Sequence, residues 1–320
     1  INVVRCSWNK WIPFNEKFKI KTLEYISNLG FKEYSEKNGI PDIIHCHSIV
    51  YSGFISEYLS KNFNIPFLIT EHNSGFKKGN YDHLLPQILR ICNKSSKCLA
   101  VSSKLAILLN KKIKNLSPWQ THNNLVSKHF FNKKLKIKKD KNFTFISVGN
   151  LIKEKNFPLL LKSFRNFNKK YPNSKLKIVG SGNQLKNLIK ISKNLNIFSN
   201  VTFLGTLSRK EVIHQIINSD VSISSSNYET FGIFSAESIS LGKVVISTSN
   251  MGCYDILNEE VGVIISINNE LELTNAMINV FENYNAYDPK KIRNYALNKF
   301  SDKILTKKLI IYYNNILNNK

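Results

Sequence analysis

The sequence predicts an α/β protein with two doubly wound parallel sheets, and three observations support this. Short β-branched runs alternate with helix-length amphipathic stretches along nearly the whole chain, a pattern typical of βαβ units. The strand-like runs are almost continuously apolar, as in IPFLIT and KCLAVS, so helices should cover both sheet faces. The rhythm restarts near the middle of the chain, and 320 residues suit two medium-sized domains.

In the first half, four apolar runs predict strands, and helical patterns fall between them. The predicted strands are Asn2–Cys6, Asp42–Cys46, Pro66–Thr70 and Lys97–Val101. The predicted helices are Phe18–Leu29, Gly53–Lys61, Tyr81–Asn93 and Ser103–Lys111.

The second half repeats the alternation and ends in a helical tail. The predicted strands are Phe143–Val148, Lys175–Val179, Asn200–Leu204, Asp220–Ser224, Lys243–Ser247 and Gly262–Ile267. The predicted helices are Pro158–Asn168, Gln184–Lys193, Arg209–Asn218 and Gly232–Leu241, followed in the tail by Leu271–Tyr284, Lys290–Lys299 and Asp302–Leu317.

A charged stretch without a core face, KKLKIKKDK at 133–141, separates the halves and is interpreted as a solvated linker. We therefore place a first domain at 1–132, a second at 142–300, and a C-terminal helix at 301–320 that packs back toward the first domain. Two such domains should face each other across a cleft, where strand carboxyl ends and helix N-termini gather.

The net charge of +24 comes from 46 basic and 22 acidic residues, and the basic residues are 41 Lys and only 5 Arg. Nucleic-acid readers use Arg for bidentate contacts, so this ratio disfavours a nucleic-acid partner. We attribute most of the excess to a Lys- and Asn-rich coding bias. Attraction to an anionic membrane surface is a second contribution, and SWNKWIPFNEKFKI at Ser7–Ile20 mixes aromatic and Lys residues as interfacial segments do.

Five cysteines without a CxxC pair indicate reduced thiols in a cytoplasmic protein rather than a disulfide framework or a zinc cage. The sequence contains no Walker loop, no G-x-S-x-G elbow, no HExxH and no D-x-D pair. It also lacks an apolar run of about 18 residues that would span a membrane.

The most informative segment is NYETFGIFSAESISLGKVVI at Asn227–Ile246. A strand ends before it, Glu229 lies in a loop, and Gly232 opens a helix that carries Glu237. Such a helix N-terminus offers free N–H groups to a phosphate, and the two carboxylates could accept hydrogen bonds from sugar and ribose hydroxyls. On spacing alone, a helix-capping acid and a surface Glu are an equally good interpretation.

The E-x7-E spacing resembles the donor signature of the family-4 retaining glycosyltransferases, which have the GT-B fold. Further segments resemble that family in the same order along the chain. They are PDIIHCHS (41–48), PFLITEH (66–72), AVSSKLAILL (100–109), NNLVSKHF (123–130), FISVGNLIKEKNFPLLLKSF (145–164), KIVGSGNQ (177–184), VTFLGTLSRKEV (201–212) and SDVSISSSNYETFG (219–232).

The resemblance implies roles for individual residues in the second domain. Lys155 would neutralise the donor diphosphate beside Gly149 and Asn150, although the family's usual Arg is Asn150 here, which removes one cation. Glu229 would hold the donor sugar and Glu237 the ribose. The remaining implied contacts are backbone N–H groups of Phe231, Gly232 and Ile233.

In the first domain, the resemblance places His72 near the transferred sugar, with Glu71 supporting its loop. Without that context, a His at a strand end is more often structural. His45 and His47 flank Cys46, and we expect them to face opposite sides of their strand and to be structural.

The resemblance implies metal-independent hexosyl transfer from a UDP- or GDP-sugar, with retention and without a cofactor, to a glycan or lipid-linked acceptor in cell-surface polysaccharide synthesis. We place the enzyme in the cytoplasm, with the inner membrane face as a candidate peripheral contact. A nucleotide-sugar epimerase of GT-B architecture is the alternative, and a basic nucleic-acid-binding protein is a distant one. Because Asn2–Cys6 resembles a later strand of the family, we expect the first one or two βα units to be missing.

Overall fold

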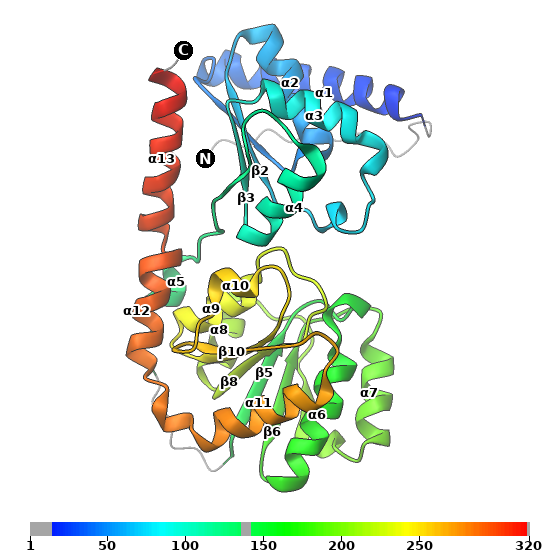
Figure 1. The fold of residues 1–320 in the computed structure, drawn as a ribbon, viewed down its shortest axis with the longest axis vertical. Helices are drawn as coiled ribbons and strands as arrows, with labels where there is room; N and C mark the ends of the chain where they lie inside the picture. The colour runs from blue at the N-terminus through cyan, green and yellow to red at the C-terminus, as the bar shows by residue number, and fades with distance from the viewer. Residues whose placement is uncertain (1–14, 136–141, 319–320) are drawn as a thin grey trace. The chain divides into compact units, whose positions relative to one another are not determined.

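The computed structural model describes residues 15–135 and 142–318 (Figure 1). The chain forms two compact units, residues 1–122 with 307–320, and residues 123–306. The division follows residue 122, whereas the sequence patterns place it at 132. Most of the stretch at 133–141 and the strand predicted at Asn2–Cys6 lie outside the described residues.

The first unit is a parallel sheet of order β1-β2-β3-β4 with helices between its strands. Its elements are α1 (Glu16–Asn38), β1 (Ile44–His47), α2 (Ile49–Phe63), β2 (Phe67–Glu71), α3 (Leu85–Lys94), β3 (Lys97–Ala100), α4 (Ser103–Ile113) and β4 (Gln120–Thr121). All five residues of β2 are buried, which explains why its sequence is continuously apolar rather than alternating. The last turns of α13 (Asp302–Asn318) belong to this unit.

The second unit is a six-stranded parallel sheet of order β10-β9-β8-β5-β6-β7. Its strands are β5 (Thr144–Val148), β6 (Lys175–Val179), β7 (Val201–Phe203), β8 (Val221–Ser224), β9 (Val244–Thr248) and β10 (Gly262–Ile265). Its helices are α5 (Lys128–Phe131), α6 (Phe157–Lys170), α7 (Leu185–Asn194), α8 (Arg209–Ile217), α9 (Ile233–Ser240), α10 (Cys253–Ile256), α11 (Glu270–Glu282) and α12 (Pro289–Phe300).

The predicted strands within the described residues are confirmed to within a few residues, and so are the longer helices. The main differences are that α1 extends well beyond Leu29 and that α2 begins at Ile49. The short elements β4, α5 and α10 were not predicted. With two to four residues each, they are too short to show a periodicity.

An aromatic cluster anchors α6 and α11 against the start of β5. The Phe145 ring meets the Phe167 ring edge-on at 4.9 Å, and Phe281 meets Phe167 at 5.6 Å. Phe145 and Phe167 are fully buried. Each edge-to-face pair contributes about 0.5–1.5 kcal/mol beyond the burial of its area. This cluster therefore stabilises the packing of α6 and α11 against the sheet that carries the site loops.

Two loops at the carboxyl edge of the second sheet approach so closely that a side chain is excluded. Gly180, with φ of 132°, has room for no Cβ because that atom would lie 2.0 Å from the Gly149 carbonyl oxygen. The Gly149 N–H donates to the Val179 carbonyl at 3.0 Å. The loop after β5 is thus held against the loop after β6.

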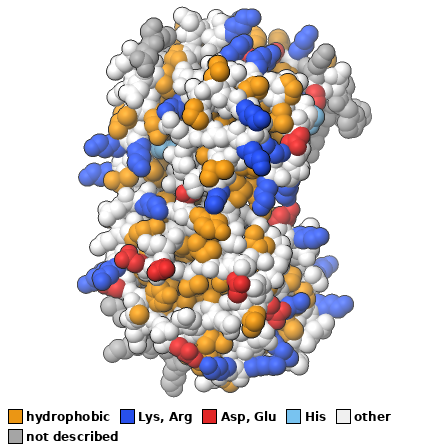
Figure 2. Space-filling model, in the orientation of Figure 1, with side chains coloured by type: hydrophobic (Ala, Val, Ile, Leu, Met, Phe, Trp, Pro, Cys, Tyr) orange, Lys and Arg blue, Asp and Glu red, His pale blue; other side chains and the backbone are white. Residues whose placement is uncertain are grey.

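Lys and Arg side chains are spread over the face drawn in Figure 2. The four described cysteines are buried and free of disulfides. Within residues 15–135 and 142–318, no helix combines the length and the hydrophobicity that crossing a bilayer requires.

Replacing Gly180 by Ala should destabilise the second unit strongly, since it adds both a steric clash and an unfavourable φ. Gly205 is the control, because its φ is 67° and a Cβ added to it would meet nothing within 4 Å. We expect Gly205→Ala to cost about 1–2 kcal/mol and Gly180→Ala about 3 kcal/mol or more in denaturant unfolding. Equal losses for the two variants would contradict the close loop approach.

Candidate active site

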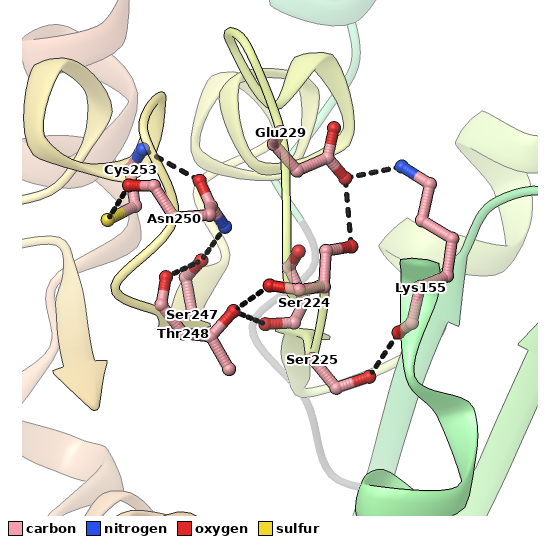
Figure 3. Close-up of polar contacts among 9 residues, drawn as sticks. Lys155, Ser224, Ser225, Glu229, Ser247, Thr248, Asn250 and Cys253 are labelled. Atoms are coloured by element: carbon pink, nitrogen blue, oxygen red, sulfur yellow. Dashed lines mark hydrogen bonds and ion pairs between the residues drawn. The ribbon is translucent and has the colours of Figure 1, made fainter. Parts of the chain in front are cut away.

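Lys155 and Glu229 meet at the carboxyl edge of the second sheet (Figure 3). Lys155 ends the short 3-10 turn Lys153–Lys155 after β5, and Glu229 lies in the loop after β8. The Lys155 ammonium donates to Glu229 Oε1, and the Ser226 hydroxyl donates to the same oxygen at 3.0 Å. Both charged side chains are about one-fifth exposed, at 23% and 18%, so the pair is shielded but open to a ligand.

Backbone contacts hold the two loops together independently of that ion pair. The Ser225 hydroxyl donates to the Lys155 carbonyl at 2.9 Å (Figure 3), and the Asn227 N–H donates to the Glu154 carbonyl at 2.8 Å. Gly149 flanks the Lys155 stem, because a Cβ at 149 would lie 3.6 Å from its Cδ and Cε. These contacts hold the backbone of Lys155 in place, and Gly149 lies against its side-chain stem.

Asn150 and Asn156 differ in their structural roles. Asn150, which stands where the resembled family has Arg, is exposed beside Gly149. Asn156 adopts the left-handed conformation with φ of 48°, which Asn tolerates better than most residues. Its amide donates to the side-chain oxygens of Asn227 at 3.0 Å and Asn268 at 2.7 Å, so it also joins the loops.

The segment Phe231–Gly232–Ile233 forms the entrance to α9. Phe231 is buried, Gly232 has φ of 93°, and Ile233 is exposed. Gly252 packs against this segment so tightly that a Cβ would lie 1.7 Å from the Phe231 carbonyl oxygen. The first N–H groups of an α-helix have no partner within the helix, so the N–H groups at the start of α9 are candidate donors to a ligand at the sheet edge.

A polar network behind the Glu229 loop ties it to β9 and α10 (Figure 3). The Thr248 hydroxyl donates to the Ser226 carbonyl at 2.5 Å. The Asn250 amide donates to the Ser247 hydroxyl at 3.2 Å, and the Asn250 side-chain oxygen accepts from the Cys253 N–H at 3.1 Å. Because these groups are buried, the network makes the loop costly to displace.

Glu237 lies on α9 and forms an ion pair with Arg209, the first residue of α8. Its side chain is only 12% exposed. Burial raises the pKa of Glu237 to about 7, while the Arg209 charge opposes that rise. Arg209 was not singled out from the sequence, because the two residues lie 28 positions apart and no local pattern links them.

His72 belongs to the first unit, directly after β2. Its Nε2 is 3.0 Å from Nδ1 of His47, and burial together with His47 lowers its pKa to about 4. It is therefore neutral near pH 7. The Glu71 carboxylate accepts from the N–H groups of His72 at 2.8 Å and Asn73 at 2.6 Å, which supports the interpretation of Glu71 as a loop-supporting residue.

The expectation that His45 and His47 face opposite sides of their strand is wrong. Their rings stack at 4.3 Å, because residues two apart in a strand point to the same face. His45 also contacts the Thr70 hydroxyl at 2.8 Å and the Tyr313 hydroxyl at 2.7 Å. In the described part of the chain, no three His, Cys, Asp or Glu side chains converge as a metal-binding group.

Comparison with known proteins identifies the family. The family described as "Glycosyl transferases group 1" matches residues 127–299, more than half of the chain, and the chain belongs to it. An uncharacterised glycosyltransferase of Haemophilus influenzae is 35% identical over 150 residues. That match spans 45% of this chain and 39% of the relative.

Solved structures show the same architecture, which is the GT-B fold of glycosyltransferases. Sucrose-phosphate synthase from Thermosynechococcus elongatus superposes with a TM-score of 0.80 at 18% identity, covering 99% of this chain and 84% of that one. Anabaena HepE, solved in complex with UDP and glucose, gives a TM-score of 0.78 at 15% identity, covering 95% of this chain and 84% of that one.

Replacing Glu237 by Gln should stabilise the protein at alkaline pH. Because the pKa of Glu237 is raised from 4.5 to about 7, the folded state holds this proton more tightly, and stability falls as pH rises from about 4.5 to about 7. Gln carries no charge, so Glu237→Gln should gain up to roughly 3 kcal/mol at pH 8 and little at pH 5. Urea unfolding at both pH values checks this. An equal change in the free energy of unfolding at pH 5 and pH 8 would contradict a buried carboxyl group with a raised pKa.

Proposed function

We propose that the protein transfers a hexosyl group from a nucleotide diphosphate sugar to a glycan or lipid-linked acceptor. One observation carries this proposal: a shielded Lys–carboxylate pair stands beside a helix N-terminus at the carboxyl edge of a parallel sheet. That edge is where α/β folds bind nucleotides. The UDP and glucose bound to the Anabaena structure favour a UDP-sugar over a GDP-sugar as donor.

In this proposal the donor separates the Lys155–Glu229 pair. The diphosphate takes over Lys155 and the N–H groups of Gly232 and Ile233, and the sugar hydroxyls donate to the Glu229 carboxylate. Glu237 accepts from the ribose hydroxyls. Lys155 and Glu229 thus each exchange an internal partner for one on the ligand, which limits the desolvation cost of binding.

We propose that the reaction proceeds with retention and without a metal ion. The bond from the anomeric carbon to the diphosphate oxygen breaks, and the acceptor oxygen bonds to that carbon on the same face. The acceptor proton passes to the departing phosphate oxygen. Lys155 stabilises the charge that develops on the leaving group, and His72, which is neutral at pH 7, serves as a hydrogen-bonding group at the transferred sugar.

Two alternatives make different predictions with the same reagents. An epimerase would convert the nucleotide sugar without an acceptor. A nucleic-acid-binding protein would show strongly salt-dependent affinity for DNA or RNA and no competition from UDP. Product analysis with and without acceptor separates the first, and competition binding separates the second.

Replacing Lys155 by Met should weaken UDP binding by about 10–100-fold, the range for a lost hydrogen bond to a charged group. Uridine, which lacks phosphates, should bind the variant as it binds the parent. Isothermal titration measures both ligands, and Lys190→Met, on the exposed side of α7, is the matched control. Unchanged UDP affinity in Lys155→Met would contradict the assignment of the diphosphate subsite.

We also propose that the protein works in the cytoplasm and contacts an anionic membrane surface peripherally, in the synthesis of a cell-surface polysaccharide. Helix α1 supports this contact. Phe18, Tyr25 and Leu29 recur at helical spacing on one face and are 52%, 65% and 50% exposed, with the exposed Lys21 and Lys32 beside them. Trp8 and Trp11 of the predicted interfacial segment lie outside the described residues.

The double substitution Phe18→Ser with Leu29→Ser should reduce co-sedimentation with vesicles of phosphatidylglycerol and phosphatidylcholine several-fold. Removing apolar contacts from an interfacial helix lowers its insertion energy. Leu116→Ser is the control, since Leu116 is 85% exposed but outside α1. Equal binding by all three proteins would exclude α1 as the contact.

A further inference from the structure

Arg209 is the first residue of α8 and lies beside Glu237, the carboxylate that we propose binds the donor ribose. Ser208 caps α8, accepting from the Glu211 N–H, and the Glu211 carboxylate accepts in return from the Ser208 N–H at 2.7 Å. This reciprocal capping box sets the first turn of α8. The Arg209 side chain is 60% exposed, whereas that of its partner Glu237 is 12% exposed.

Two partners orient the Arg209 guanidinium. Its Nη2 donates to Oε1 of Glu237, and its central carbon lies 5.3 Å from the centre of the Phe130 ring. Phe130 is fully buried on α5, so the ring is a fixed platform for the cation. These two contacts keep the Arg209 charge beside the Glu237 carboxylate.

Other charged groups on the elements packed against α9 have partners elsewhere or are exposed. Arg293 on α12 donates to the carbonyls of Ser240 and Lys133, at 3.2 and 2.6 Å. Lys243 before β9 donates to the Ile217 carbonyl at 2.9 Å. Lys299 on α12 donates to the Tyr295 hydroxyl at 2.9 Å. The remaining ones are the exposed Lys128 and His129 on α5, the exposed Lys290 and Lys291 on α12, and Asp255 on α10. Burial and Arg209 are the two influences that set the ionisation of Glu237.

The protonation state of Glu237 decides which hydrogen bonds its carboxyl group can form with a ligand. An ionised carboxylate accepts through both oxygens, whereas a protonated one offers a donor and weaker acceptors. Ribose hydroxyls that donate to Glu237 therefore need its charged form. The contact from Arg209 uses Oε1 and comes from an exposed side chain, so it favours the charged form without occupying Oε2.

We infer that Arg209 is a positioning residue of the nucleoside subsite, which holds the Glu237 carboxylate charged and oriented for the ribose hydroxyls of the donor. This inference rests on the proposed role of Glu237. It assigns the first turn of α8 and the Phe130 platform to donor recognition, although neither belongs to the E-x7-E segment.

The test is isothermal titration of UDP between about pH 6 and pH 8.5 with the parent protein, Arg209→Gln, Arg209→Lys and Glu237→Gln. The parent should lose affinity as pH falls through about 7, because Glu237 then takes up a proton. Because Gln at position 237 does not titrate, the pH dependence of UDP affinity in Glu237→Gln reports the titration of the UDP phosphates alone. Thermal unfolding of each variant verifies that it is folded.

Arg209→Gln should move the affinity inflection to higher pH, because removing an adjacent positive charge raises a carboxyl pKa by about one unit or more. Its affinity should be about threefold below that of the parent at pH 7.5 and about tenfold below it at pH 6, because the ionised fraction of Glu237 differs most below both pKa values. At pH 8.5 the two affinities should be nearly equal. Arg209→Lys, which keeps the charge, should restore most of the parental profile.

A loss of affinity that is the same at every pH, with no shift of the inflection, would overturn the inference and leave Arg209 a packing residue. Parental affinity in Arg209→Gln would overturn it as well. If Glu237→Gln instead binds UDP as the parent does, the proposed ribose contact itself fails, and this outcome is distinguishable because it does not involve Arg209.

Discussion

The parallel arrangement of the second sheet brings the groups of the site together. Because all six strands run in the same direction, the loops that follow them emerge at one edge. Lys155 follows β5 and Glu229 follows β8, strands that are neighbours in the sheet, although the two side chains lie 74 residues apart in the chain. The close contact between Gly149 and Gly180 holds the loop that follows β5 against the loop that follows β6.

Charge compensation is the second organising feature. Two carboxylates at this edge, Glu229 and Glu237, are each paired with one cation, Lys155 and Arg209. A buried carboxylate without a partner would cost several kcal/mol, and the raised pKa of Glu237 shows that even a paired one remains strained. The Lys155–Glu229 pair joins the loops that follow β5 and β8, and Lys155 is the cation that we propose the donor takes over, whereas Arg209 stays with Glu237. Lys155 and Arg209 thus account for a small part of the positive charge by pairing with carboxylates, although most Lys side chains are exposed.

The sequence predicted much of this organisation, for reasons that particular elements make clear. Strands such as β2 are buried on both faces, so their apolar runs were unambiguous. The prediction that His45 and His47 face opposite sides of their strand is wrong because only adjacent residues alternate between the faces, whereas residues two apart share one. Arg209 was missed because its ion pair with Glu237 depends on tertiary structure, and its helix cap alone gives no functional signal. Asn156 lies in the segment 145–164 that resembles the family, but the sequence did not predict its left-handed backbone conformation.

In the proposed donor complex, a nucleotide sugar replaces the internal partners of Lys155 and Glu229. A crystal structure of the protein with intact UDP-glucose would show whether this exchange takes place. We predict the Lys155 ammonium within hydrogen-bond distance, about 2.7–2.9 Å, of a diphosphate oxygen, with the Glu229 carboxylate on glucose hydroxyls. A bound donor that leaves the Lys155–Glu229 pair intact, or that lies away from the α9 N-terminus, would contradict the proposal.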